Sequence, residues 1–212
     1  MDLCAIFDVD GTLFDTGAGI KDCVRYALSA LNAPPLSETQ LNTFIGPSLF
    51  YSFSHTAKLS EEDAARAVAL YREKYAATGI DSAVPYPGVL DMLGRLHRKG
   101  VLLSVASSKP QVFVDKLLKN YEITELFTRV CAPDYAKTSN DKAALIAAAA
   151  AAPRSVMVGD TRFDIEGAHK AGIQAIAVLY GYGDKSELTA ADYTADSPMH
   201  VADLLLSFPP ER

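Results

Sequence analysis

The sequence of 212 residues contains no tryptophan, only three cysteines and fewer basic than acidic side chains. The cysteines lie too far apart for a CxxC pair or a Cys/His cluster, which argues against a disulfide framework or a zinc site. The 20 lysines and arginines against 26 acidic residues give a net charge of −6. Binding to a nucleic-acid backbone needs a surplus of basic charge, so we expect no nucleic-acid partner.

Long hydrophobic segments are missing as well. No run reaches the roughly 18 consecutive apolar residues of a membrane span, and the N-terminal residues lack the basic start and cleavage site of a secretory signal. The most hydrophobic long stretch, 143–152, is rich in alanine and ends before Pro153. This pattern predicts a helix of about three turns in a globular protein. We therefore expect a cytoplasmic protein without membrane contact.

Five short apolar runs predict buried strands, and amphipathic or alanine-rich stretches separate the last four of them. The runs are 3–7, 101–106, 126–131, 155–158 and 173–178. Strands that alternate with helices in this way are typical of a parallel sheet with helices on both faces. The sequence therefore predicts an α/β fold with a doubly wound parallel sheet, in which functional residues lie at the carboxyl ends of the strands.

Residues 16–80 interrupt this alternation with helical patterns alone. An apolar face recurs at helical spacing, formed by Ile20, Val24, Leu28 and Leu31. Ser60 precedes three acidic residues, as the N-cap of another helix would. Glycines flank the segment on both sides, with prolines on the C-terminal side. We expect an all-helical insertion, or cap, over 16–80, and an α/β core formed by 1–15 and 81–212.

Two pairs of acidic residues follow predicted strands. Asp8 and Asp10 come directly after the first run, and Asp160 and Asp164 come after the run 155–158. Either pair alone is compatible with a turn or a helix cap. Because the carboxyl ends of parallel strands share one edge, four carboxylates would gather there and repel one another without a hard cation. Magnesium resolves this repulsion and also recruits phosphate.

Hydroxyl groups follow a third strand. The run 101–106 ends at Ser107 and Ser108, and Pro110 suits the first turn of the following helix. Hydroxyl and backbone N–H groups at the start of a helix readily bind phosphate oxygens. An ordinary helix cap is the alternative interpretation.

In this order, the motifs resemble those of the haloacid dehalogenase superfamily, specifically its phosphatases with an α-helical cap, such as phosphoglycolate phosphatase. The resemblance rests on Asp8-Val9-Asp10-Gly11-Thr12, on Ser107, on a lysine before the alanine-rich helix, and on Gly159-Asp160 with Asp164. It spans nearly the whole chain, including the position of the cap. It implies a Rossmann-like core, magnesium as the cofactor and a small phosphorylated metabolite as the substrate.

The resemblance also implies a covalent mechanism. Asp8 would attack phosphorus to form an aspartyl phosphate, and Asp10 would protonate the leaving oxygen and then activate water. Magnesium would bind Asp8, the backbone carbonyl of Asp10, and Asp160. Asp164 would hold a coordinated water or the lysine of the site, and Thr12 would support the ligands from behind.

The resemblance implies that three further residues bind the phosphate. Ser107, Ser108 and nearby backbone amides would hold the phosphoryl oxygens. The lysine is Lys142 or Lys137, and we favour Lys142 because the Ala-Ala-Leu-Ile after it opens the alanine-rich helix. The Lys-Pro that many phosphoglycolate phosphatases carry at this point is absent, which leaves the substrate open.

We expect a magnesium-dependent phosphatase of small phosphomonoesters, as a monomer or homodimer. A 5'-nucleotidase, a sugar phosphomutase and a phosphonatase are alternatives on the same fold, and the phosphonatase would need a cap lysine such as Lys21, Lys58 or Lys74. A non-enzymatic receiver of phosphate is a further alternative, but it has no helical insertion and no second carboxylate like Asp10. The cap loop 44–49 either faces the substrate or simply connects two helices.

Overall fold

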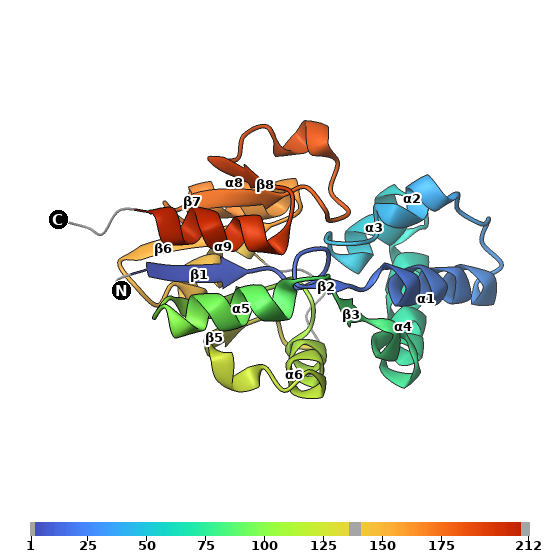
Figure 1. Ribbon diagram of the computed structural model, residues 1–212. Coiled ribbons are helices and arrows are strands. Elements are labelled where there is room, and N and C mark those ends of the chain that lie inside the picture. The colour runs from blue at the N-terminus through green and yellow to red at the C-terminus, as the bar shows by residue number, and fades with distance from the viewer. Residues whose placement is uncertain (1–2, 136–140, 209–212) are drawn as a thin grey trace.

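The computed structural model describes residues 3–135 and 141–208. Its centre is a six-stranded sheet in the order β5-β4-β1-β6-β7-β8, in which neighbouring strands run parallel (Figure 1). The strands are β1 (Leu3–Phe7), β4 (Leu102–Ala106), β5 (Phe127–Cys131), β6 (Arg154–Gly159), β7 (Gln174–Val178) and β8 (Tyr193–Ala195). The first five of these were predicted. Strand β8 was not predicted, because three residues at a sheet edge form too short a pattern.

Side chains of β1 alternate between two apolar layers, which is why the strand is apolar throughout. Leu3, Ala5 and Phe7 belong to one cluster of buried residues, whereas Cys4 and Ile6 belong to another. The two clusters lie on opposite faces of the sheet, so the central strand is buried on both sides.

Helices cover both faces of the sheet. Three of them supply residues to the cluster of Leu3, namely α5 (Val89–Arg98), α6 (Gln111–Asn120) and α9 (Pro198–Ser207). Two others supply the cluster of Cys4, namely α7 (Lys142–Ala149) and α8 (Arg162–Lys170). Short 3₁₀ helices η2 (Thr124–Leu126) and η3 (Lys185–Leu188) complete the core. The predicted doubly wound α/β architecture is thereby confirmed.

Helix α7 is shorter than the three turns predicted for 143–152. It begins after Asp141, whose carboxylate accepts a bond from the N–H of Ala143 at 3.0 Å, and it ends at Ala149. The guanidinium of Arg129 donates to the carbonyl oxygens of Ala148 and Ala150 at 3.0 and 2.6 Å. This strand residue satisfies carbonyls at the end of the helix, and the proline downstream disfavours helical backbone before it.

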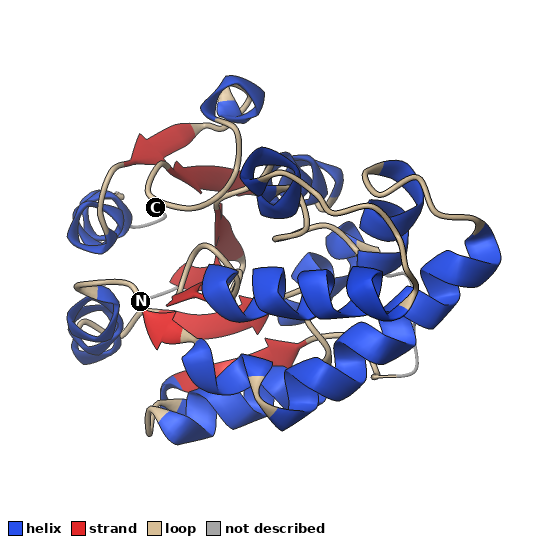
Figure 2. Ribbon diagram, turned by 90° about the vertical axis from the view of Figure 1, so that its right-hand side faces the viewer, coloured by secondary structure: helices blue, strands red, loops and turns tan. Residues whose placement is uncertain are grey.

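The cap lies between two short strands, β2 (Phe14–Asp15) and β3 (Val84–Pro85), which pair in antiparallel fashion. Its helices are α1 (Gly17–Ala30), α2 (Glu38–Asn42), α3 (Leu49–His55), α4 (Glu61–Ala77) and the 3₁₀ helix η1 (Gly79–Ser82). Ser60 caps α4 as its position predicted, since its hydroxyl accepts a bond from the N–H of Asp63 at 3.1 Å. The helices gather at the carboxyl end of the sheet (Figures 1 and 2).

One apolar cluster continues from the sheet into the cap. It includes Phe7 of β1 together with Val24 of α1 and Val68 of α4. The cap is therefore packed against the core, at the edge where the sequence predicted the chemistry. Among the described residues, no helix is long and apolar enough to cross a membrane.

Candidate active site

The site begins where β1 ends and the chain turns sharply. Asp8 is 4% exposed, and Gly11 has a φ of 84°, a left-handed conformation that side chains rarely adopt. A Cβ atom on Gly11 would lie 2.1 Å from an oxygen of Asp160. Only glycine therefore allows the loop after β1 to approach the acid that follows β6.

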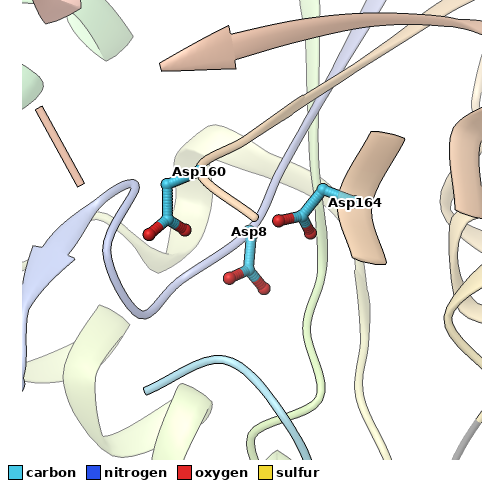
Figure 3. Close-up of side chains that lie close together, drawn as sticks. All are labelled: Asp8, Asp160 and Asp164. Atoms are coloured by element: carbon cyan, nitrogen blue, oxygen red, sulfur yellow. The ribbon is translucent and has the colours of Figure 1, made fainter. Parts of the chain in front are cut away.

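Three buried carboxylates meet at this edge of the sheet. Oxygen atoms of Asp8, Asp160 and Asp164 all lie within 4.8 Å of one another, and Figure 3 shows the three side chains converging from separate segments. Asp160 and Asp164 are each 1% exposed. Three hard oxygen donors at this spacing fit a magnesium ion. Asp8 and Asp160 would be its side-chain ligands, with Asp164 within reach of the same position.

The side chain of Asp10 does not join this cluster. Its carboxylate instead accepts bonds from the ammonium of Lys109, at 2.9 and 3.2 Å. The side chain of Asp10 is therefore not part of this cluster, and the backbone carbonyl of Asp10, which the resemblance implies as a magnesium ligand, stays a prediction.

Neighbouring groups fix the acids of the cluster. Thr12 lies behind Asp160, and its hydroxyl donates to that carboxylate at 3.3 Å. The N–H of Tyr182 donates to the other oxygen of Asp160 at 2.8 Å. Asp164 accepts bonds from both the N–H and the hydroxyl of Thr161, at 3.0 and 2.8 Å. The carboxylates are thus held in place before any ligand binds.

Crowding and burial change how these acids titrate. Burial, with smaller contributions from neighbouring acids, raises the pKa of Asp8 to about 6 despite the nearby Lys142. Burial together with the charges of Asp164 and Asp8 also raises the pKa of Asp160 well above its ordinary value. Both shifts favour the protonated acids in the metal-free cluster, whereas a bound divalent cation would favour their ionised forms.

Lys142 lies beside the nucleophile that the sequence predicted. Its ammonium is 2.8 Å from an oxygen of Asp8 and 2.8 Å from an oxygen of Asp164. Burial alone would lower the pKa of Lys142, but the two carboxylates raise it above its ordinary value, so the side chain stays charged. The alternative residue, Lys137, lies outside the described residues.

Ser107 and Ser108 follow β4 at the same edge. Both line a cavity that also contains Asp8. The N–H of Ser107 donates to the carbonyl oxygen of Cys131 at 3.1 Å, so Ser107 offers a ligand its hydroxyl rather than its amide. Pro110 stands at the N-cap of α6, one position before the first turn in which the sequence placed it.

Lys109 was not predicted as a residue of the site. This lysine is 7% exposed and contacts both Asp10 and the hydroxyl of Tyr75, which lies 2.7 Å from its ammonium. Its position directly after Ser107-Ser108 was a signal, because a charge at a strand end is placed to meet the site. No local pattern could have identified Tyr75 as its partner.

A cavity that opens to solvent lies between the cap and the core, next to Asp8 and Asp10. Residues of the cap loop 44–49 line it, as the substrate-facing interpretation of that loop requires. The remaining lining is mostly apolar or aromatic and includes Val68, Tyr71, Tyr75 and Phe113, with Arg72 as a cation. A phosphorylated compound bound to Asp8 would place its leaving group against these lining residues.

The chain is similar to known proteins in sequence and in fold. The model of the haloacid dehalogenase-like hydrolase family matches residues 5–178. A 5'-nucleotidase from Pseudomonas aeruginosa is 34% identical over 199 residues and covers 90% of both chains, and a phosphoglycolate phosphatase from Vibrio parahaemolyticus is 30% identical and covers 94% of both. The crystal structure of a predicted phosphatase from Clostridium acetobutylicum has a TM-score of 0.90 at 31% identity, covering 97% of this chain and 98% of that one. The chain therefore belongs to the haloacid dehalogenase-like hydrolase family and falls among its phosphatases.

Proposed function

We propose that this phosphatase hydrolyses small phosphorylated metabolites in a magnesium-dependent reaction, with an aspartyl phosphate on Asp8 as the intermediate. One observation carries the proposal. The buried carboxylate of Asp8 borders both a cluster of acids suited to a divalent cation and the cavity between cap and core. A binding protein would need the cation and the cavity, but it would not need a second, separately held acid such as Asp10.

The two acids divide the chemistry between them. An oxygen of Asp8 forms a bond to phosphorus as the bond to the leaving oxygen breaks, and protonated Asp10 gives that oxygen its proton. The carboxylate of Asp10 then takes a proton from water as the water oxygen attacks phosphorus. The bond between phosphorus and Asp8 breaks, which releases phosphate and restores the nucleophile.

Positive charge must surround the phosphoryl group during both steps. Lys142 contributes one charge at 2.8 Å from Asp8, and the hydroxyl of Ser107 offers a donor. Magnesium, when bound, supplies further charge beside the phosphoryl oxygens. Enhancements of up to ~10²¹ for phosphomonoester hydrolysis correspond to about 29 kcal/mol, whereas one hydrogen bond to a charged group contributes about 1.5–3 kcal/mol. Several groups must therefore act together.

The leaving group is proposed to be small and to contact the cap. The relatives point to two chemistries, since one is a 5'-nucleotidase and another a phosphoglycolate phosphatase. The cap loop 44–49 and Arg72 line the cavity and are the groups that would select between them. The phosphonatase alternative is less well supported, because Lys21, Lys58 and Lys74 are absent from the described lining of this cavity.

The cytoplasm is the compartment that we propose. Cys4, Cys23 and Cys131 are all free thiols. Free thiols suit a reducing compartment, which is consistent with the proposed metabolite substrates.

Substitution of the nucleophile tests the proposal. Asp8→Asn replaces a carboxylate by an amide, which is a poor nucleophile, so we expect phosphate release to fall to background. The assay measures phosphate release from phosphoglycolate, nucleoside monophosphates and sugar phosphates, with magnesium and with EDTA. Asp203→Asn, on the surface of α9, is the matched control and should retain full activity. Full activity of Asp8→Asn, or equal rates in EDTA, would contradict the proposal.

A further inference from the structure

A buried ammonium joins the cap to the core next to the cavity. Lys109 follows β4 in the core, and its Nζ lies 2.9 Å from one oxygen of Asp10 and 3.2 Å from the other. The same Nζ lies 2.7 Å from the hydroxyl of Tyr75, which belongs to cap helix α4. A lysine ammonium carries three protons. It can therefore bond the core acid and the cap hydroxyl at the same time.

Cap packing alone does not require this polar contact. The ring of Tyr75 already packs edge-on against Phe113 of α6, with 5.0 Å between centroids, and stacks on Tyr71 at 5.5 Å. These contacts bury the ring whether or not it carries a hydroxyl. Burying Lys109 opposes folding unless its charge is paired. The hydrogen bonds of Lys109 therefore contribute little to stability. Their main effect is to orient the carboxylate of Asp10.

We propose that Tyr75 is a positioning residue, which orients Lys109 and through it the carboxylate of Asp10, so that this acid is in place when α4 is seated on the core. The inference rests on the proposed function, because it assigns Asp10 to proton transfer. Lys109 bonds both oxygens of Asp10 and thereby fixes the plane of the carboxylate. The hydroxyl of Tyr75 fixes the ammonium from the side of the cap. Neither Tyr75 nor Lys109 exchanges a proton or forms a covalent bond in the reaction.

The two chemical steps depend differently on this orientation. An alkyl phosphate needs Asp10 twice, to protonate the leaving oxygen and then to take a proton from water. p-Nitrophenyl phosphate needs Asp10 only for the second step, because its leaving group departs without a proton. A misplaced Asp10 therefore slows the hydrolysis of the aspartyl phosphate more than its formation from this substrate. Phosphoenzyme should accumulate as a result.

The first experiment removes only the hydroxyl. With p-nitrophenyl phosphate and magnesium, we expect Tyr75→Phe to lower kcat about tenfold without raising KM, and to increase the fraction of phosphoenzyme in acid-quenched samples. Tyr121→Phe is the matched control. It removes a tyrosine hydroxyl that donates to the carbonyl oxygen of Ala83 at 2.9 Å, away from the cavity. A merely structural defect would lower the amount of active protein and leave the phosphoenzyme fraction of that protein unchanged.

The second experiment tests whether Tyr75 acts through Lys109. In a Lys109→Met background the tyrosine hydroxyl has no ammonium to orient, so adding Tyr75→Phe should change kcat less than about twofold. Additive losses in the double variant would overturn the proposal, as would a Tyr75→Phe enzyme that matches Tyr121→Phe. Failure of the proposed function is recognised separately, since Asp8→Asn would then retain turnover and no variant would form phosphoenzyme.

Discussion

Asp10 and Asp8 are neighbours in the sequence, yet each is paired with a lysine of its own. Asp10 is held by Lys109 at 2.9 Å, and Asp8 is held by Lys142 at 2.8 Å. Lys109 follows strand β4 and Lys142 is the first residue of helix α7, so the two carboxylates have different surroundings. Different surroundings allow adjacent acids to take different roles in one reaction. At the scale of single residues, we propose that this separation distinguishes the nucleophile, Asp8, from the acid–base group, Asp10.

Asp10→Asn tests that separation. An amide cannot take a proton from water, so we expect kcat to fall about 10²- to 10⁴-fold. Phosphoenzyme should still form from p-nitrophenyl phosphate, which quenched-flow measurements can follow. The substitution also removes the charge that pairs the buried ammonium of Lys109, so we expect a lower free energy of unfolding. Circular dichroism therefore verifies that the variant is folded under the assay conditions. Unchanged turnover would refute the role of Asp10, and so would a variant that forms no phosphoenzyme.

At the scale of elements, the loop after β7 holds Asp160 and the loop after β1 in place through hydrogen bonds. The N–H of Tyr182 holds Asp160 at 2.8 Å, and the hydroxyl of Tyr180 donates to the carbonyl oxygen of Thr12 at 3.1 Å. A Cβ atom on Gly183 would lie 1.8 Å from the backbone oxygen of Asp160. The loop can approach this closely only because a glycine stands at that position.

Gly183→Ala should therefore displace Asp160 and weaken metal binding. We expect half-maximal activity to require about tenfold more magnesium, an effect of the size seen when support of a metal ligand is lost. Gly94→Ala is the matched control, since its Cβ would meet only the flexible end of Arg98, at 3.1 Å. In the interior of α5 it should raise the free energy of unfolding by about 0.5–1 kcal/mol. Equal magnesium requirements in the two variants would contradict this account of the loop.

At the scale of the whole molecule, we expect the acid cluster to make the free energy of unfolding depend on both pH and magnesium. Burial raises the pKa of Asp8 from 3.8 to about 6. The folded, metal-free protein therefore binds a proton that the unfolded chain releases. The contribution of Asp8 to the free energy of unfolding is full below its ordinary pKa and is lost as the pH rises through 6. Magnesium would bind the deprotonated form, so we expect its stabilising effect to increase over the same range.

Thermal unfolding with magnesium and with EDTA measures this coupling. Magnesium at a hundredfold excess over Kd stabilises by about 2.7 kcal/mol, which corresponds to a rise in Tm of about 5–10 °C for a chain of this size. We expect this rise at about pH 7.5 and a smaller one at about pH 5. Asp160→Asn should lose the rise, whereas Asp203→Asn should keep it. Equal rises at both pH values would contradict the coupling.

Local patterns in the sequence predicted most of the sheet and the place of the site. Apolar runs marked five strands, and the parallel arrangement follows from their alternation with helices. Once the strands were parallel, their carboxyl ends had to share one edge, so Asp8 and Asp160 had to come close together. These features depend on periodicity and chain order, which are readable one segment at a time.

Tertiary structure alone decided which side chains became partners. Asp10 and Lys109 are 99 positions apart, and Tyr75 and Lys109 are 34 apart, with one of them in the cap. At the end of α7, the carbonyl oxygens likewise accept hydrogen bonds from Arg129 of strand β5. Buried polar groups must find partners wherever packing brings them. Packing within the core brings Asp10 to Lys109, and the seating of the cap on the core brings Tyr75 to the same lysine. No single stretch of sequence carries a signal for either pairing.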